Sequence, residues 1–473
     1  MNPRWGEISP GELITPISGE LISGSRDVIL KGLCTDSRQL EKGQLFWALK
    51  GENFDGHDFI EKAAERGAAC VVAEMRPGLA FPSAGKMTVI AVKDTLKALG
   101  DLAGWWRHQY GIPVAAVTGS TGKTTTKEMA AHILEVKART LKNRGNFNNL
   151  IGLPLTLLSL EAGHRRAVLE MGMNRFGEIG RLTEIADPDV GLITNVARAH
   201  LEGLGDIEGV ARAKTEIIGK MSAEGLVVLN GDDALLMKTA SAFRKKCTTF
   251  GLGAGNDIKA QKIRDLGPEG FLFELQWQGG VIPVKLNVPG FQNIYNAMAA
   301  SAIALGLGEA PEDLIEGLKR FRGIKGRFML TRLKNNILLV DDTYNSNPYS
   351  LKAAINSLRT LAINGRRVIV GLGEMMELGH ETSSAHREAG EMVAGLGASH
   401  FVALGEHAGD MVKGAVEKGL PPGRTAIAQT HEEMAGTLMG VLEKGDVIFL
   451  KGSRMAGLDN VAERLIEESS EEG

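Results

Sequence analysis

The chain has 473 residues, of which 43% are hydrophobic and 23% are charged, and its formal net charge is −3. These values are typical of a globular protein with about three domains, and the near-neutral charge argues against nucleic-acid and membrane-surface partners. Three widely spaced cysteines argue against a disulfide framework, no apolar run is long enough to span a membrane, and the N-terminus lacks a signal-peptide pattern, so we expect a cytoplasmic protein.

The first 110 residues mix short strands and helices. We expect strands at residues 45–49 and 69–73 and helices at residues 58–66 and 93–110. Two polar loops accompany them, one with Ser37 and Arg38 and the other with Asp55, Gly56 and His57. An arginine, a hydroxyl group and a histidine in such loops are suited to binding a phosphorylated substrate. The alternative is that these residues only cap turns.

A buried strand at residues 114–117 leads into a Gly-rich turn and then into a helical pattern. The turn and the start of the helix read TGSTGKTT: Thr118, Gly119, Ser120, Thr121, Gly122, Lys123, Thr124 and Thr125. Backbone N–H groups of such a turn and the positive end of the helix bind phosphate oxygens. Lys123 would reach the terminal phosphates and the Thr124 hydroxyl would bind Mg²⁺. The pattern predicts nucleotide binding, although Val117 stands where the long motif has glycine; the alternative is a simple strand–helix turn.

Alternating strands and helices continue from the Gly-rich turn to about residue 322. Glu170 ends a strand at residues 167–169, and His200 follows a strand at residues 190–196. In a doubly wound sheet ligands bind at the carboxyl ends of the strands, so we expect the Gly-rich turn, Glu170 and His200 to meet there. Glu170 offers a carboxylate to Mg²⁺. His200 is an unusual Mg²⁺ ligand and has the alternative role of an ordinary loop histidine.

Three further features complete this central region. Lys214 lies on a predicted helix, and its pattern favours a solvated surface lysine. Period-2 alternation around Gly279 predicts a β-hairpin. Asn293 and Asn296 follow on a helix about one turn apart, where their amide groups are able to read an adenine edge.

The last part of the chain reads as a third α/β unit. A linker carries Arg327, and a strand ending at Asp342 is followed by an Asn-rich loop with Asn345 and Asn347. Two more strands run into polar loops, at residues 372–378 and in the sequence KGSR. We therefore expect an α/β protein of three domains: a small mixed α/β domain at 1–110, a central P-loop domain with a doubly wound, mostly parallel sheet at 111–324, and a Rossmann-like α/β domain at 325–473.

These motifs resemble the Mur ligase family in their order and spacing. The segments that carry the resemblance are TGSTGKTTTKE, NFNNLIGLP, LEMGMNRFGEIG, NVARAHLEGLG, ARAKTEII, GFQNIYNAMAA, GRF and VDDTYNSNP. They cover essentially the whole chain. The N-terminal TDSR and LFWALKGENFDGHDF are similar to the branch whose first domain binds the UDP group of a UDP-MurNAc-peptide.

The resemblance implies a catalytic centre of Lys123, Glu170, His200 and Lys214. Thr124, Glu170 and His200 would surround Mg²⁺, and a carbamylated Lys214 would bridge to a second Mg²⁺.

It also implies the substrate contacts. Asn293 and Asn296 would hold adenine, while Arg327 and Asp342 would reach the nucleotide. Ser37 and Arg38 would lie at the uridine diphosphate end, in the same domain as Asp55, Gly56 and His57. Asn149 would lie near the reacting carboxylate, and Asn345, Asn347 and the loop at 372–378 would form the pocket for the second substrate.

Within this branch, DDTYNSNP, LGEMMELG and KGSR resemble the ligase that adds D-alanyl-D-alanine to UDP-MurNAc-tripeptide. The resemblance implies a cytoplasmic, monomeric, ATP- and Mg²⁺-dependent ligase of peptidoglycan precursor synthesis that forms an acyl phosphate. One alternative is the ligase that adds the third amino acid, whose DNPR-type signature is missing from the last domain. The other is a P-loop kinase or switch.

Overall fold

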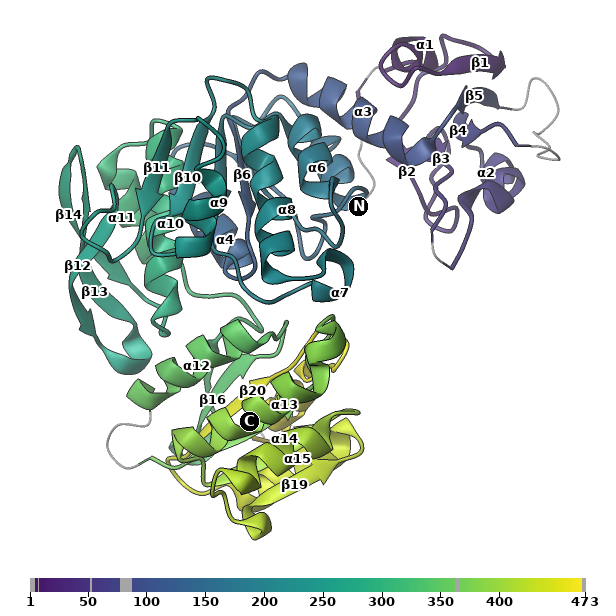
Figure 1. The fold of residues 1–473 in the computed structure, drawn as a ribbon. Helices are drawn as coiled ribbons and strands as arrows, with labels where there is room; N and C mark the ends of the chain where they lie inside the picture. The colour runs from purple at the N-terminus through teal and green to yellow at the C-terminus, as the bar shows by residue number, and fades with distance from the viewer. Residues whose placement is uncertain (1–4, 7, 52, 77–86, 362–365, 470–473) are drawn as a thin grey trace.

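The computed structural model describes residues 5–6, 8–51, 53–76, 87–361 and 366–469. It is a mixed α/β structure with four sheets (Figure 1). Among the described residues, no helix combines the length and the apolar content needed to cross a lipid bilayer.

The first part of the chain forms a five-stranded sheet in the order β1-β5-β4-β3-β2, with β1 antiparallel to β5 and the other pairs parallel. Its elements are α1 (Pro10–Ile14), β1 (Glu20–Ser23), β2 (Leu33–Cys34), β3 (Leu45–Trp47), the 3-10 helix η1 (Gly56–Phe59), α2 (Ile60–Glu65), β4 (Cys70–Glu74), β5 (Thr88–Val92) and α3 (Thr95–His108). The single helix expected at 58–66 is thus two elements, because the Asp55 side chain caps a separate 3-10 turn through the His57 N–H.

The central sheet has six parallel strands in the order β11-β10-β9-β6-β8-β7. Its strands and helices are β6 (Val114–Thr118), α4 (Lys123–Leu134), β7 (Thr140–Lys142), α5 (Gly152–Leu157), β8 (Arg166–Glu170), α6 (Glu178–Ala186), β9 (Val190–Ile193), α7 (Leu201–Leu204), α8 (Ile207–Lys220), β10 (Leu226–Asn230), α9 (Ala234–Ala240) and β11 (Cys247–Phe250). Every residue of β6 is buried, as expected for a strand covered on both faces. The predicted doubly wound sheet is confirmed.

A three-stranded antiparallel sheet, β12-β13-β14, and two helices extend this central region. The elements are β12 (Lys259–Asp265), η2 (Gly267–Glu269), β13 (Phe271–Trp277), β14 (Gly280–Leu286), α10 (Gln292–Gly306) and α11 (Pro311–Arg320). The hairpin predicted at Gly279 is confirmed, with Trp277 paired to Gly280. Apolar residues of this sheet and of α10 share a core with α4 and the central sheet.

The last part forms a six-stranded sheet in the order β15-β16-β20-β17-β18-β19, in which only the β15–β16 pair is antiparallel. Its elements are β15 (Met329–Arg332), η3 (Lys334–Asn336), β16 (Leu338–Asp342), α12 (Pro348–Leu361), β17 (Val368–Gly373), η4 (Gly379–Glu381), α13 (Thr382–Leu396), β18 (His400–Leu404), α14 (Ala408–Glu417), η5 (Pro422–Arg424), β19 (Thr425–Ala428), α15 (His431–Val441), β20 (Val447–Lys451) and α16 (Asp459–Ser469). Two apolar clusters, one on each face, form its own core.

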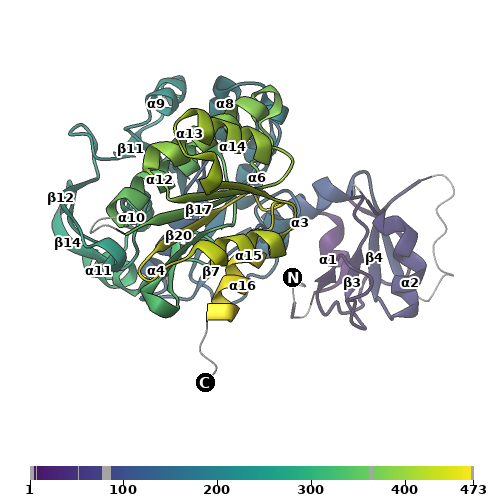
Figure 2. The same ribbon diagram turned by 90° about the horizontal axis from the view of Figure 1, so that it is seen from below.

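One apolar core continues from the first region into the central one. Trp5 packs on Trp106 of α3 with ring centroids 5.6 Å apart, and the two indole N–H groups donate to the carbonyls of Leu158 and Leu160 after α5. Leucines of the first sheet and of the central domain belong to the same cluster. Figures 1 and 2 show α3 lying between the two regions, while the last sheet lies on another side of the central region. The boundaries near residues 110 and 325 stay predictions.

Candidate active site

The carboxyl ends of strands from the central and the last sheets face one another. On the central side β6, β8 and β10 end at Thr118, Glu170 and Asn230, and on the other side β16 and β20 end at Asp342 and Lys451. A cavity of about 420 Å³ lies between them. It is lined by residues of the Gly-rich turn, of α10 and of α12, among them Ser120, Thr121, Gly122, Asn293, Asn296, Arg327, Asp342, Asn345, Asn347, Asn356 and Lys451.

The Gly-rich turn needs its glycines. Gly119 has a φ of +145°, and a Cβ there would lie 1.8 Å from Thr194 Oγ1. Gly122 has a φ of +80°, and its Cβ would lie 2.5 Å from Asn296 Oδ1. Any side chain at either position would displace the turn, whose N–H groups and following helix are suited to bind phosphate.

Two residues that follow β9 hold the turn in place. Thr194 Oγ1 donates to the carbonyl of Thr121 at 2.6 Å, and Asn195 Oδ1 accepts from the Thr121 N–H at 3.0 Å. Sequence reasoning missed both, because it extended the strand to residue 196, whereas β9 ends at Ile193. Polar residues directly after a buried central strand were the available signal.

Lys123 begins α4 and bends back over the turn. Its Nζ donates to the Gly119 carbonyl at 2.8 Å. Burial lowers the pKa of this lysine, and the nearby Glu170 carboxylate opposes that shift. Lys123 therefore contacts the phosphate-binding turn and lies close enough to Glu170 for their charges to interact, and its catalytic role stays a prediction.

Glu170 is 3% exposed, and only one of its two carboxylate oxygens accepts a hydrogen bond from a described residue. Its Oε1 accepts from Asn148 Nδ2 at 2.8 Å, whereas its Oε2 and the Thr118 Oγ1 are buried and have no hydrogen-bond partner in the part of the chain that the structure describes. A buried carboxylate oxygen without a partner is costly unless it binds a ligand. The oxygen donors of this region are of the kind that Mg²⁺ prefers, so the site fits a cation here.

Among the described residues, no three His, Cys, Asp or Glu side chains gather into a metal site by themselves. A Mg²⁺ site here would have to combine Glu170 with other donors, such as the Thr124 hydroxyl. In this structure that hydroxyl accepts from Arg327 Nη2 at 3.1 Å.

Lys214 on α8 is 1% exposed, so the sequence pattern that favoured a solvated lysine is wrong. Its ammonium group makes no hydrogen bond or ion pair with any described residue. Burial lowers the pKa of Lys214 well below its usual value, and the charge of Lys123 adds to the effect. The residue is therefore a buried amine that is readily kept neutral.

His200 meets a residue of the last domain. Its Nδ1 lies 2.5 Å from Glu377 Oε2, at ion-pair distance but without the alignment of a hydrogen bond. The Leu201 N–H donates to the Glu377 carbonyl at 3.1 Å. Contact with His200, joined by the charge of Lys123, lowers the pKa of Glu377. Glu377 lies in the predicted loop at 372–378, but nothing in the sequence singled it out.

Asn293 and Asn296 are buried on α10 beside the cavity. Asn293 Nδ2 donates to the Pro289 carbonyl at 2.7 Å, and Asn296 Nδ2 donates to Asn293 Oδ1 at 3.0 Å. Thr126 Oγ1 of α4 donates to Asn296 Oδ1 at 3.3 Å. The pair connects the cavity wall to the helix that starts at Lys123, and its role toward adenine stays a prediction.

Arg327 and Asp342 lie at the junction of the central and last domains. Arg327 lies over the ring of Tyr344, 4.0 Å from its centroid, and its buried Nε has no partner. Asp342 Oδ2 accepts from Lys451 Nζ at 2.7 Å. Burial raises the pKa of Asp342, although Lys451 opposes the shift. Arg327 is therefore available to an anion in the cavity, whereas Asp342 already has a cationic partner.

The predicted substrate residues of the central and last domains have local partners. Asn149 Oδ1 accepts from the backbone N–H groups of Ile151 and Gly152 before α5. Asn347 Oδ1 accepts from the Ser350 N–H in the first turn of α12. Asn345 lies on the cavity wall, and its carbonyl accepts from Lys451 Nζ. Their roles toward substrate stay predictions.

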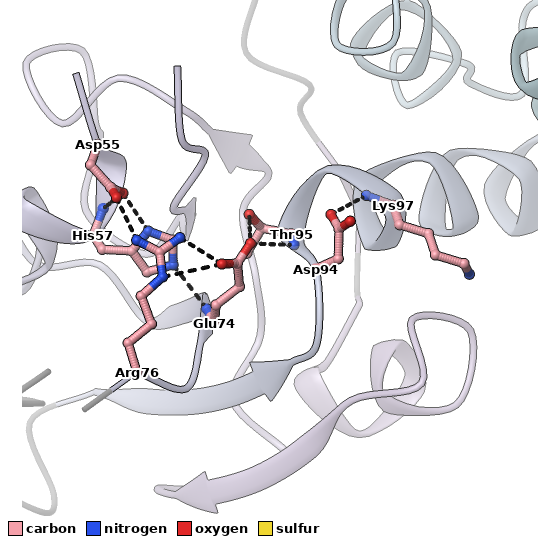
Figure 3. A network of polar contacts seen from close by, with 7 residues as sticks. All are labelled: Asp55, His57, Glu74, Arg76, Asp94, Thr95 and Lys97. Atoms are coloured by element: carbon pink, nitrogen blue, oxygen red, sulfur yellow. Dashed lines mark hydrogen bonds and ion pairs between the residues drawn. The ribbon is translucent and has the colours of Figure 1, made fainter. Parts of the chain in front are cut away.

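The residues of the first domain that were predicted to bind the uridine diphosphate end do not line this cavity. Ser37 is buried, and the Arg38 side chain is 80% exposed beside Asp36. Figure 3 shows Asp55 and His57 in a network with Arg76 and Glu74. His57 Nδ1 lies 2.5 Å from Asp55 Oδ1, and His57 Nε2 accepts from the Glu74 N–H.

This network predicts a loss of stability in acid. Burial alone would raise the pKa of Asp55, but hydrogen bonds from His57 and Arg76 outweigh it and lower the pKa from 3.8 to about 2. The stabilisation is fully present above pH 4 and disappears as the pH falls toward 2. We expect Asp55→Asn to lower the free energy of unfolding at pH 7 by about 1–2 kcal/mol, after allowance for solvent screening.

Urea unfolding at pH 7 and pH 3 checks this expectation, because the difference between wild type and variant should shrink at pH 3. Asp58→Asn is the matched control, since Asp58 is exposed in the same 3-10 turn. An equal effect of Asp55→Asn at both pH values would contradict the assignment.

Comparison with known protein families gives three matches along the chain. They are "Mur ligase family, catalytic domain" at residues 29–107, "Mur ligase middle domain" at 117–304 and "Mur ligase, glutamate ligase domain" at 326–454. The matched ranges correspond to the three successive regions of the fold.

Whole-length relatives agree with these matches. The UDP-N-acetylmuramoyl-tripeptide--D-alanyl-D-alanine ligase of Bacillus subtilis is 37% identical over 93% of this chain and 94% of its own length. The Escherichia coli protein of the same name is 36% identical over 97% and 98%.

Solved structures give the same result. A crystal structure of MurF from Acinetobacter baumannii has a TM-score of 0.87 and 34% identity, covering 98% of this chain and all of that one. MurF from Thermotoga maritima in complex with ADP has a TM-score of 0.82 and 29% identity over 92% and 97% of the two chains. The arrangement of sheets, the Gly-rich turn facing a buried glutamate and lysine, and similarity along the whole length lead to one conclusion: the chain belongs to the Mur ligase family.

Proposed function

We propose that this chain joins D-alanyl-D-alanine to UDP-MurNAc-tripeptide at the expense of ATP, in the synthesis of peptidoglycan precursors. One observation supports the proposal most directly: the phosphate-binding turn lines the cavity between the central and last domains, and Lys123 after it is close enough to Glu170 and Lys214 for their charges to interact. The names of the full-length relatives support the choice of substrates, and the ADP complex of the Thermotoga maritima protein supports the nucleotide.

The chemistry follows from the weakness of a carboxylate as an electrophile. An oxygen of the peptide's terminal carboxylate attacks the γ-phosphorus of ATP, and the bond between that phosphorus and the β–γ bridging oxygen breaks. ADP departs, and the peptide is left as an acyl phosphate. The neutral amine of the dipeptide then attacks the acyl carbon. Phosphate leaves with the electron pair of the C–O bond, and the amine loses one proton as the amide forms.

The residues around the cavity suit these steps. The turn at residues 118–122 and the start of α4 bind phosphate oxygens, and the Lys123 ammonium offsets the negative charge of the transferring phosphoryl group. Arg327 also lines the cavity, where its Nη2 donates to the Thr124 hydroxyl and its buried Nε has no hydrogen-bond partner among the described residues. Positioning and electrostatic stabilisation provide most of the rate in such a site.

We further propose that Thr124, Glu170 and His200 hold Mg²⁺, which would neutralise phosphate charge. Lys214 fits the second cation site through carbamylation, in which its neutral nitrogen attacks CO₂, forms an N–C bond and releases a proton. The product is a buried carboxylate in place of a buried amine. The burial of Lys214 and its lowered pKa support this role.

The remaining substrate contacts are proposals from the same resemblance. Loops of the first domain with Ser37, Arg38 and residues 55–57 would bind the uridine diphosphate end. Asn149 would lie near the acyl group. Asn345, Asn347 and the loop at 372–378 would receive the dipeptide. We also propose that the protein is cytoplasmic, because its substrates would be ATP and a UDP-linked peptide, and that it is a monomer.

Phosphate release tests the function directly. We expect release from ATP only when UDP-MurNAc-tripeptide and D-alanyl-D-alanine are both present. Turnover with the UDP-dipeptide and a single amino acid would indicate the ligase for the third residue instead. Phosphate transfer to a small molecule without amide formation would indicate a kinase.

Domain closure is a second expected result. Arg327, at the start of the last domain, donates to Thr124 of the central domain, and the cavity between the two domains must admit ATP. We expect the radius of gyration in small-angle X-ray scattering to fall when an ATP analogue and UDP-peptide are added together. Equal radii with and without ligands would contradict closure.

A further inference from the structure

The carboxylate of Glu377 in the last domain reaches His200 of the central domain. Glu377 Oε2 lies 2.5 Å from His200 Nδ1, and the Glu377 carbonyl accepts from the Leu201 N–H. A second contact, between Arg198 and Glu381 at 3.3 Å, lies beside the first. The short loop from β17 to η4 therefore meets the short segment around His200 at two points.

Both contacting residues adopt a backbone conformation that is unfavourable for residues other than glycine. His200 has a φ of 57° and Glu377 a φ of 64°, in the left-handed region that non-glycine residues rarely adopt. Such conformations persist where the surroundings impose them, often at functional sites. Here they turn the two side chains toward one another.

The loop that carries Glu377 is firmly anchored. Met375 and Leu378 are buried in the core of the last domain at 3% and 1% exposure, while Met376 and Glu377 project between them. The Met375 N–H donates at 2.8 Å to Nε2 of His386, a fully buried residue. The backbone on both sides of Glu377 is therefore held by the core of the last domain.

We propose that Glu377 is a positioning residue that orients His200 for cation binding when the last domain closes. Its carboxylate lies against Nδ1 and its negative charge favours a proton on that nitrogen, which leaves Nε2 as the unprotonated ring nitrogen. Histidines that bind metals commonly donate their other N–H to a carboxylate or carbonyl, which fixes the tautomer and raises the basicity of the ligand. In this chain that carboxylate comes from a different domain, so the cation site would be complete only in the closed form.

The inference rests on the proposed function, because it assigns His200 to a cation. The test measures Mn²⁺ binding by electron paramagnetic resonance in the presence of a saturating ATP analogue and UDP-MurNAc-tripeptide, the pair of ligands expected to close the domains. Loss of an outer-shell partner lowers metal affinity about 10- to 100-fold. We expect Glu377→Ala to weaken Mn²⁺ binding about 10-fold, and Glu377→Gln to weaken it less, since the amide oxygen still accepts the proton.

Glu381→Gln is the matched control. It removes the neighbouring contact with Arg198 at the same boundary, and we expect its Mn²⁺ affinity to equal that of wild type. Unchanged affinity in Glu377→Ala would overturn the proposal. Tighter binding would overturn it too, because it would mean that Glu377 competes with the cation for His200.

A second measurement needs no metal. Nitrogen-15 shifts of His200 in the metal-free protein, with the ATP analogue and UDP-MurNAc-tripeptide bound, should indicate a proton on Nδ1 in wild type, with a shift toward the Nε2-protonated tautomer in Glu377→Ala. The same tautomer in both proteins would overturn the proposal. Failure of the proposed function is recognised separately, as a wild-type protein that releases no phosphate with both substrates.

Discussion

Replacement of Lys123 by alanine should abolish ligation. The Lys123 ammonium lies against the Gly119 carbonyl inside the phosphate-binding turn, close enough to Glu170 for their charges to interact. Removing one preorganised charge that stabilises a transferring group costs about 10²–10³-fold in kcat, and we expect a loss at the upper end of that range. Phosphate release with both substrates present provides the measurement.

The matched control is Lys137→Ala. Lys137 follows the same helix, is 55% exposed and pairs with Asp313 on the surface, so its loss should leave kcat unchanged. Circular dichroism should show that both variants are folded. A Lys123→Ala protein with more than a tenth of the wild-type kcat would contradict the role given to this lysine.

The second large effect is expected at Lys214. Lys214→Ala removes the buried amine and with it the proposed carbamate, and we expect kcat to fall about 100-fold or more, as for loss of one strong electrostatic group in an active site. Because alanine leaves space, formate or acetate should restore part of the activity. Lys220→Ala, on the same helix but exposed and paired with Glu184, should behave as wild type.

Chemical evidence for the carbamate is independent of kcat. After equilibration with ¹³C-labelled CO₂, the wild-type protein should give a carbamate carbon signal that is absent from Lys214→Ala. Full activity of the variant, or an identical labelled signal in both proteins, would remove the carbamate from the proposal.

Local patterns predicted the parts of the site that one stretch of chain builds alone. The strand, Gly-rich turn and helix around Lys123 are contiguous, so their arrangement follows from backbone chemistry and short spacing. Glu170 was placed correctly at the end of its strand because parallel strands bring their carboxyl ends to one edge of the sheet.

Long-range contacts escaped prediction for physical reasons. Thr194 and Asn195 look like a continuation of an apolar strand, but their side chains bind the turn instead. Lys214 has the spacing of a surface residue, and only the packing of α8 beneath the site buries it. Glu377 meets His200 across a domain boundary, and nothing near either residue in the sequence specifies that meeting.

The continuous apolar core around Trp5 and Trp106 has a mechanical consequence. Because the first domain shares that core with the central one, whereas the last domain has cores of its own, the molecule should behave as two bodies joined by one hinge. The UDP-linked peptide and ATP would both bind to the larger body, which consists of the first and central domains. Only the last domain, which would carry the dipeptide amine, would need to rotate. One rotation would then both bring the second substrate to the acyl group and start the reaction.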